Sequence, residues 1–196
     1  RIVEDHAGNG PQGFIQIEGQ HSAAIQSIIS ASTIDANRCG TLSLGRHRND
    51  TVGGSPTLVN SGDSLGAICF AGGDGHDMRT KGAKIVCQVD GNPGQDDMPG
   101  RLMFFTTPDG DGSPDERLRI TSDGHVSIVA DNKKLLIGGS DDIQVYHDGA
   151  NSYIENRTGD LNIQSTASGA DDIFITAKDD IFIRPQGGEN GIICYG

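Results

Sequence analysis

The sequence lacks tryptophan, has few aromatic side chains and contains no stretch of about 20 apolar residues that would form a membrane helix. Aromatic residues make up 5% of the 196 residues and hydrophobic residues 34%, whereas glycine contributes 29 residues. A chain this poor in apolar volume is marginal as a monomer. Disorder or association can follow, and the short alternating apolar runs favour association.

Basic residues are also scarce. The chain has 15 Lys and Arg against 27 Asp and Glu, which gives a formal net charge of -12. Such a surface repels the phosphates of nucleic acids and anionic membranes. We therefore expect no nucleic-acid partner and no membrane insertion. Because the chain begins at Arg1 and shows no signal peptide, we expect it to be a processed or excised piece of a longer protein.

Motifs of catalysis and of metal binding are missing. No nucleophile elbow, phosphate loop, dinucleotide fingerprint or EF-hand spacing is present, and no two histidines are four residues apart. The cysteines, which form no CxxC pair, are Cys39, Cys69, Cys87 and Cys194. Cys69 and Cys87 fall in apolar runs and are predicted to be buried free thiols. We predict no enzyme, no cofactor and no metal site.

Alternating apolar residues predict an all-β fold. Strands are expected over 14–17, 41–44, 66–70, 84–89, 101–106, 117–121 and 126–129. Asp123 and Gly124 lie between two such runs, and this dipeptide favours a two-residue hairpin turn. The best candidate for a helix is the stretch 21–30, but its β-branched residues and the adjacent Gly19 argue against one there.

The length and spacing of the apolar runs change after about Asp131. We predict a β-sandwich-like or knob-like domain over 1–130 and a short-strand shaft over 131–196. In the second part acidic residues precede short apolar runs at 143–145, 161–163, 173–175 and 181–183, which form a degenerate repeat. The first and third side chains of each run share a face. One chain cannot close a core from such narrow strips, so the repeat predicts an intertwined homotrimeric β-prism or triple β-helix.

The acidic pairs that enter these runs are the strongest candidates for a bound cation. Asp141-Asp142, Asp171-Asp172 and Asp179-Asp180 offer carboxylate oxygens, which hard cations prefer. They lack the spacing of known calcium loops. We interpret them as residues that cap turns and keep strand ends solvated.

Two groups of segments are similar to bacteriophage proteins. GDSLGAICFAGGDG at 62–75, MPGRLMFFTT at 98–107 and ERLRITSDG at 116–124 resemble the fibre-body module of phage tail fibres. LLIG at 135–138 and DDIQVYHDGANSYI at 141–154, with GDL at 159–161, look like the short-strand repeat of virion proteins from marine phages, particularly those infecting cyanobacteria.

The resemblance implies a parallel homotrimer in the virion, made in the host cytoplasm and joined to other tail proteins. Members of this family often end in a self-cleaving intramolecular chaperone, and no segment here resembles it. The function implied is attachment to a host glycan or protein without catalysis. The alternatives are a purely structural appendage or spacer and a polysaccharide-degrading tailspike domain. A tailspike would need a catalytic pair of carboxylates, and an acidic chain contains many chance pairs that the sequence cannot rank.

Loops are expected to carry receptor binding, since the trimer core uses the strand residues. The loops are 72–81, 90–98 and 108–115. The candidate receptor-binding residues are Asp74, His76, Asp77, Arg79, Asn92, Gln95, Asp96, Asp109, Asp111, Tyr146 and His147. His147 lies at a predicted strand end, where it contacts a ligand, lines a trimer axis or is a solvated turn residue.

Overall fold

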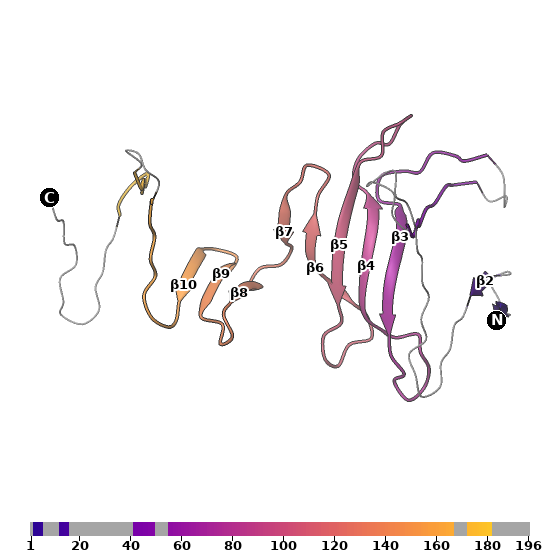
Figure 1. Ribbon diagram of the computed structural model, residues 1–196, viewed down its shortest axis with the longest axis horizontal. Coiled ribbons are helices and arrows are strands. Elements are labelled where there is room, and N and C mark those ends of the chain that lie inside the picture. Colours follow the sequence, from indigo (N-terminus) through magenta and orange to yellow (C-terminus); the bar gives the residue numbers. More distant parts are fainter. Residues whose placement is uncertain (1, 6–11, 16–40, 50–54, 167–171, 182–196) are drawn as a thin grey trace, which may run out of the picture. The chain divides into compact units, whose positions relative to one another are not determined.

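The computed structural model describes residues 2–5, 12–15, 41–49, 55–166 and 172–181. Within these ranges every regular element is a β-strand and every paired strand is antiparallel (Figure 1), which confirms the all-β prediction. No helix of a length and apolarity suited to crossing a membrane occurs in them. The weak helical pattern at 21–30 lies outside the described residues. The chain divides into two compact units, 1–130 and 131–196.

The first unit contains a five-stranded antiparallel meander in which each strand pairs with the next along the chain. Its strands are β3 (Ser64–Ala71), β4 (Lys81–Val89), β5 (Gly100–Thr106), β6 (Asp115–Ile120) and β7 (Val126–Ile128). A separate pair is formed by β1 (Ile2–Asp5) and β2 (Gln12–Ile15). The predicted hairpin forms between β6 and β7, but its connection is longer than the predicted two-residue turn. The Thr121 N–H donates to the His125 carbonyl at 3.0 Å, and of Asp123 and Gly124 only Gly124, with a φ of 81°, is left-handed. The predicted runs from 66 to 129 therefore all become strands, with slightly different ends.

The strand expected over 41–44 is wrong, because residues 41–49 belong to no strand. This segment, which we call the arm, lies against β3 through side chains. Leu44 approaches Gly66 so closely that a Cβ added at Gly66 would lie 2.6 Å from the Leu44 Cβ. Close approach to a glycine, rather than a backbone ladder, holds the arm here. The run predicted at 14–17 begins earlier as β2, and its last two residues lie outside the described ranges.

The register gives the five-stranded sheet two different faces. One row crosses it from Ile68 through Ile85, Phe104 and Leu118 to Ile128, and successive rows show the same character. We call this the apolar face of β3–β7; it consists of Gly66, Ile68, Phe70, Ala83, Ile85, Cys87, Leu102, Phe104, Leu118, Ile120, Val126 and Ile128. The opposite, polar face carries Lys84, Val86, Gln88, Arg101, Met103, Phe105, Glu116, Arg119 and Ser127.

The buried side chains of this sheet do not all lie on its apolar face. Val86 and Met103, which lie on the polar face, are 6% and 5% exposed. Long side chains lie on the same face: Lys84 is over the Phe105 ring at 4.2 Å, and Arg119 forms an ion pair with Glu116 at 2.7 Å. On the apolar face, Ile68 is 46% and Phe70 55% exposed. The buried apolar side chains of this unit are therefore divided: Val86 and Met103 lie on the polar face, Val89 follows Cys87 at the end of β4 on the apolar face, and Val59 precedes β3.

The sandwich-like arrangement expected for residues 1–130 is not seen among the described strands, whose contacts are with their neighbours in the same sheet. No described strand packs on the apolar face, where Ile68, Phe70 and Val126 are 46%, 55% and 68% exposed. The prediction that Cys69 is buried is also wrong, because Cys69 is exposed and Cys87 half-buried, both with free thiols. Cys69 lies on the edge strand β3 and pairs with Lys84, so it belongs to the polar face. Cys39 and Cys194 lie outside the described residues.

The second unit contains a three-stranded antiparallel sheet in the order β10-β9-β8. Its strands are β8 (Lys134–Ile137), β9 (Ile143–His147) and β10 (Ser152–Asn156). Gly138 and Gly149 have φ values of 96° in the two connecting turns. One face carries the aliphatic row Leu135, Val145 and Ile154, and the other carries Lys134, Tyr146 and Tyr153.

The short-strand repeat gives one strand in a single chain. Run 143–145 lies in β9, whereas 161–163 and 173–175 are not strands, contrary to the prediction. Ile163 and Ile175 are largely exposed. A three-residue run has no ladder to join unless another segment supplies one. Residues 182–183 of the last run lie outside the described ranges, and the intertwined prism stays a prediction.

Candidate functional site

The three predicted receptor-binding loops lie at opposite ends of the five-stranded sheet. Loops β3–β4 and β5–β6 share one end, where the Thr107 N–H donates to the Gly82 carbonyl at 2.9 Å. Loop β4–β5 lies at the other end beside the β6–β7 turn, and the Ser122 N–H donates to the Asp90 carboxylate at 3.0 Å. The alternating arrows of β3, β4 and β5 show the same division (Figure 1). One flat receptor surface therefore cannot meet all three loops at once.

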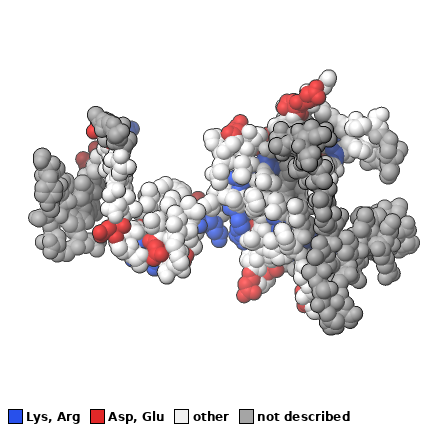
Figure 2. All heavy atoms as spheres, in the orientation of Figure 1, with Lys and Arg blue, Asp and Glu red and all other residues white. Residues whose placement is uncertain are grey.

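Both ends of this sheet are acidic. Asp109 and Asp111 lie in loop β5–β6, and Asp96 and Asp97 in loop β4–β5. Acidic side chains project from the two ends of the unit in Figure 2. Within the described residues, no three His, Cys, Asp or Glu side chains are arranged to hold a metal ion.

Asp74 organises loop β3–β4 from within. Its carboxylate accepts the N–H groups of His76 and Asp77, both at 2.9 Å, and the Thr80 hydroxyl at 2.8 Å. These bonds, the Asp77 N–H first among them, lower the pKa of Asp74 to about 2. Asp74 therefore folds the loop around itself, and its oxygens are already engaged in the single chain.

The other predicted residues of this loop lie at its surface. Asp77 accepts the Arg79 N–H at 2.8 Å and lies 3.9 Å from the Arg79 guanidinium. The His76 side chain is 93% exposed and that of Arg79 77%. Met78, which the sequence did not single out, is exposed between them. His76, Met78 and Arg79 are thus the side chains that this loop presents to solvent.

Loop β4–β5 ends in a tight turn. Gly94 and Asp97 exchange backbone hydrogen bonds at 2.9 and 3.3 Å, and Asp96 has a φ of 55°. Gln95 and Asp96 form the exposed tip, and Asn92 is exposed nearby. Aspartate tolerates the left-handed conformation better than most residues, which accounts for its place in the turn.

Loop β5–β6 contains the other two acidic candidates. Asp111 accepts the Ser113 N–H at 3.1 Å, and its own N–H donates to the Pro108 carbonyl at 3.2 Å. Asp109 is exposed next to Gly110, whose φ is 80°. Asp111 is thus mainly a turn residue, like Asp74.

Sequence reasoning missed a buried carboxylate at Asp63. Its two oxygens receive a fork of bonds from Arg48 at 2.6 and 2.9 Å, and the Asn60 N–H donates to it at 2.9 Å. Arg46 lies 3.5 Å away. The Arg48 guanidinium, followed by the Asn60 N–H, lowers the pKa of Asp63 to about 2. No motif marks this pair, which fastens the arm to the start of β3.

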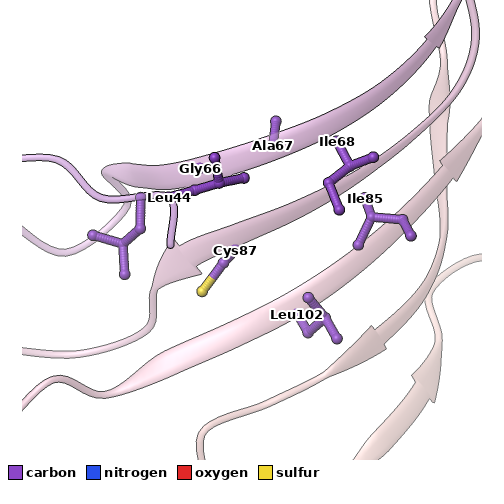
Figure 3. Close-up of a pocket in the computed structure, with 8 residues that line it drawn as sticks. Leu44, Gly66, Ala67, Ile68, Ile85, Cys87 and Leu102 are labelled. Carbon is purple, nitrogen blue, oxygen red and sulfur yellow. The ribbon is translucent and has the colours of Figure 1, made fainter. Parts of the chain in front are cut away.

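A hollow of about 180 Å³ lies between the arm and the apolar face. Figure 3 shows Leu44 on one side of it and Ile68, Ile85 and Leu102 on the other. Cys87 also contributes to its wall, and no charged side chain does. The hollow is suited to an apolar group, and it continues the uncovered face.

Tyr146 and His147, the candidates in the second unit, belong to β9. The rings of Tyr146 and Tyr153 stack with centroids 4.7 Å apart and an angle of 16° between planes. The Lys134 ammonium lies 4.2 Å from the Tyr146 centroid. His147 Nδ1 is 3.2 Å from the Ser152 hydroxyl, and the His147 ring is exposed.

Hydrogen bonds fix this cluster at the β9–β10 turn. The Tyr153 hydroxyl donates to Asp148 at 2.9 Å, and this bond raises the pKa of Tyr153. Asp148 also accepts the N–H groups of Asn151 at 2.7 Å and Ala150 at 2.8 Å, which lower its pKa. Desolvation raises the pKa of Tyr146. Sequence reasoning named Tyr146 but missed its alignment with Lys134 and Tyr153.

No protein-family model matches the chain, and no curated protein matches it significantly. Two solved structures share part of its backbone arrangement. One is the carboxy-terminal domain of the bacteriophage T5 L-shaped tail fibre, with a TM-score of 0.49, 16% identity, and coverage of 74% of this chain and 49% of that one. The second is that domain with its intramolecular chaperone domain, with a TM-score of 0.39, 17% identity, and coverage of 88% and 38%. The chain spans less than half of either structure, and such likenesses assign no function.

Proposed function

We propose that this chain is a segment of a homotrimeric bacteriophage tail fibre or virion appendage, which takes part in host attachment and carries no catalytic activity. The observation that carries the proposal is the uncovered apolar face of β3–β7. Soluble proteins rarely expose a large contiguous apolar patch unless a partner covers it. Here the patch spans five strands, and the second unit exposes the aliphatic row of Leu135, Val145 and Ile154 as well.

A second copy of the chain is the partner that best fits these faces. The low apolar content of the sequence leaves one chain short of core, and the two uncovered faces are where the missing contacts would form. Association through identical faces adds apolar burial without any other component. The number three rests on the short-strand repeat, and the virion location on the resemblance of residues 62–161 to phage fibre proteins.

We place host attachment at the ends of the sheet, because other copies of the chain would cover its apolar face. The end formed by loops β3–β4 and β5–β6 is the better candidate, since His76, Met78 and Arg79 are exposed on a loop that Asp74 already orders. Arginine and methionine are enriched in binding interfaces, and an ordered loop loses less entropy on binding. Tyr146 and His147 remain candidates in the second unit.

A purely structural spacer is the second candidate. It is favoured by the way in which Asp74 and Asp111 use their carboxylates to form turns, which leaves fewer groups for a receptor. Adsorption competition separates the two roles: purified protein that blocks phage adsorption to a host, with cyanobacteria tested first, supports attachment. Protein that assembles but blocks nothing and binds no glycan on an array supports the spacer.

Light scattering tests the assembly itself. A mass three times that of the 20.6 kDa chain is expected, whereas a stable folded monomer would contradict the proposal. Incubation with host polysaccharide tests the lack of catalysis. Release of oligosaccharides would replace attachment with a tailspike activity.

A further inference from the structure

The sheet of the second unit has two edges that no described strand covers. Strands β8 and β10 each pair only with β9, so the outer side of each presents unpaired backbone N–H and C=O groups. Both run antiparallel to β9 and therefore run in the same direction as each other. Two copies that point the same way along a common axis would bring β10 of one and β8 of the next together as parallel strands.

The side chains at these two edges are complementary. Across the sheet, Lys134 lies over the Tyr146 ring, and that ring stacks on Tyr153. The row therefore begins with a cation at the β8 edge and ends with an aromatic ring at the β10 edge. Tyr153 is 38% exposed although its inner face is stacked. A lysine ammonium placed over the outer face of Tyr153 gains a cation–π contact.

Formal charge follows the same pattern. Lys133 and Lys134 lie next to each other at the start of β8. Glu155 lies on β10, where its side chain is 44% exposed and 3.9 Å from the Arg157 guanidinium of the same chain. Glu155 is on the same face as Tyr153, one row along the strand. Two β8 edges would bring lysines together, whereas the β10 edge offers an aromatic ring and a carboxylate, so charge favours head-to-tail contact between copies over contact between two β8 edges.

We propose that β10 of one copy pairs with β8 of the next, so that the second copy's Lys134 ammonium lies between its own Tyr146 ring and the Tyr153 ring of the first copy. This inference rests on the proposed homotrimer and names the contact that closes it. Three such contacts join three sheets into a closed ring without free edges. The aliphatic rows of Leu135, Val145 and Ile154 then meet inside the ring.

A designed disulfide tests this junction. Leu135 and Ile154 lie in one row, at opposite edges of the sheet with Val145 between them. Two strand spacings separate them by about 10 Å, beyond the limit of about 7 Å between Cα atoms for a disulfide. In the Leu135→Cys/Ile154→Cys double variant, with the native cysteines replaced by serine, oxidation should link different chains and give covalent dimers and trimers on a denaturing gel.

Controls make the outcomes separable. Each single-cysteine variant should give no covalent trimer on the denaturing gel. The Ile137→Cys/Ile154→Cys pair, which is offset by one row, should form far fewer cross-links. Light scattering on the same samples reports assembly. Trimers that do not cross-link through Leu135 and Ile154 would overturn the junction and leave the proposed function standing. Monomers in every sample would overturn both.

A second comparison tests the role of the aromatic row. Tyr153→Leu removes the ring and should lower trimer stability, whereas Tyr153→Phe keeps the ring and loses the bond to Asp148, and should retain most of it. Lys134→Met should weaken the trimer more than Lys133→Met, which removes the same charge next to the row. Equal effects of the two lysine substitutions would show that general charge, rather than the contact with Tyr153, holds the edges together.

Discussion

Truncating Ile68 is the most direct perturbation of the apolar face. Ile68 lies in the central row of β3–β7 and is 46% exposed in the single chain. Complete burial of such a side chain is worth roughly 1.5–3 kcal/mol. Covering the exposed part by another copy is therefore worth about 1 kcal/mol per chain, or about 3 kcal/mol per trimer.

Ile68→Ala should lose most of this contribution, which corresponds to roughly a hundredfold change in the association constant of three chains. Because three chains combine, the concentration at which half the trimer dissociates should rise about tenfold. Sedimentation velocity over a dilution series measures that concentration directly.

Val86→Ala is the matched control on the polar face. Val86 is 6% exposed within one chain, so its truncation should lower the free energy of unfolding by roughly 1–3 kcal/mol. It should leave the dilution midpoint of the folded protein almost unchanged. If Ile68→Ala and Val86→Ala shift the midpoint equally, or if neither does, the apolar face is not the surface that copies share.

Two further predictions concern the folds of the separate units. The Asp63 pKa of about 2 lies below its usual 3.8, so the bond with Arg48 stabilises the fold above pH 4 and is lost as the pH falls toward 2. Urea unfolding at pH 6, 4 and 2 should show that the free energy of unfolding falls more steeply with decreasing pH in the wild type than in Asp63→Asn. Asp109→Asn is the control at an exposed aspartate and should behave like the wild type. Parallel curves for the wild type and Asp63→Asn would refute this. Gly138→Ala should destabilise the second unit by about 1 kcal/mol or more. Gly138 has a φ of 96°, and an added Cβ would lie 2.2 Å from an Asp142 oxygen. Gly139→Ala is the control, because a Cβ added there meets nothing within 4 Å. Similar melting temperatures for the two glycine variants would contradict that reasoning.

Alternation along the chain was sufficient to predict the main sheet. Runs such as 84–89 and 101–106 place apolar residues at every second position, and this period is intrinsic to a strand with one apolar face. The same period places Cys69 on the face opposite Ile68 and Phe70. Its place on the polar face therefore follows from strand alternation, although the neighbouring apolar residues suggested that it would be buried. The arm could not be predicted, because its place depends on the contacts of Leu44 with Gly66 and of Arg48 with Asp63, which no local pattern records.

Residue type and loop position were sufficient to select the candidate binding residues, but not to predict how these residues are arranged in space. Loops were correctly located between strands, but their distribution over two ends depends on the meander order of the sheet. The sequence also does not distinguish an aspartate that meets solvent from one that folds its own loop, as Asp74 does through His76, Asp77 and Thr80. The alignment of Lys134, Tyr146 and Tyr153 requires the register of three strands, which is set by turns at Gly138 and Gly149.

The acidic turns at both ends of the five-stranded sheet affect how two copies could associate end to end. Copies of a protein that associate end to end can build open-ended filaments. Two copies brought end to end would place Asp96 and Asp97 of one against Asp109 and Asp111 of the other. Like charges at contact, within the screening length of about 8 Å in physiological salt, make that approach unfavourable. The same carboxylates that shape the loops therefore oppose end-to-end contact between copies.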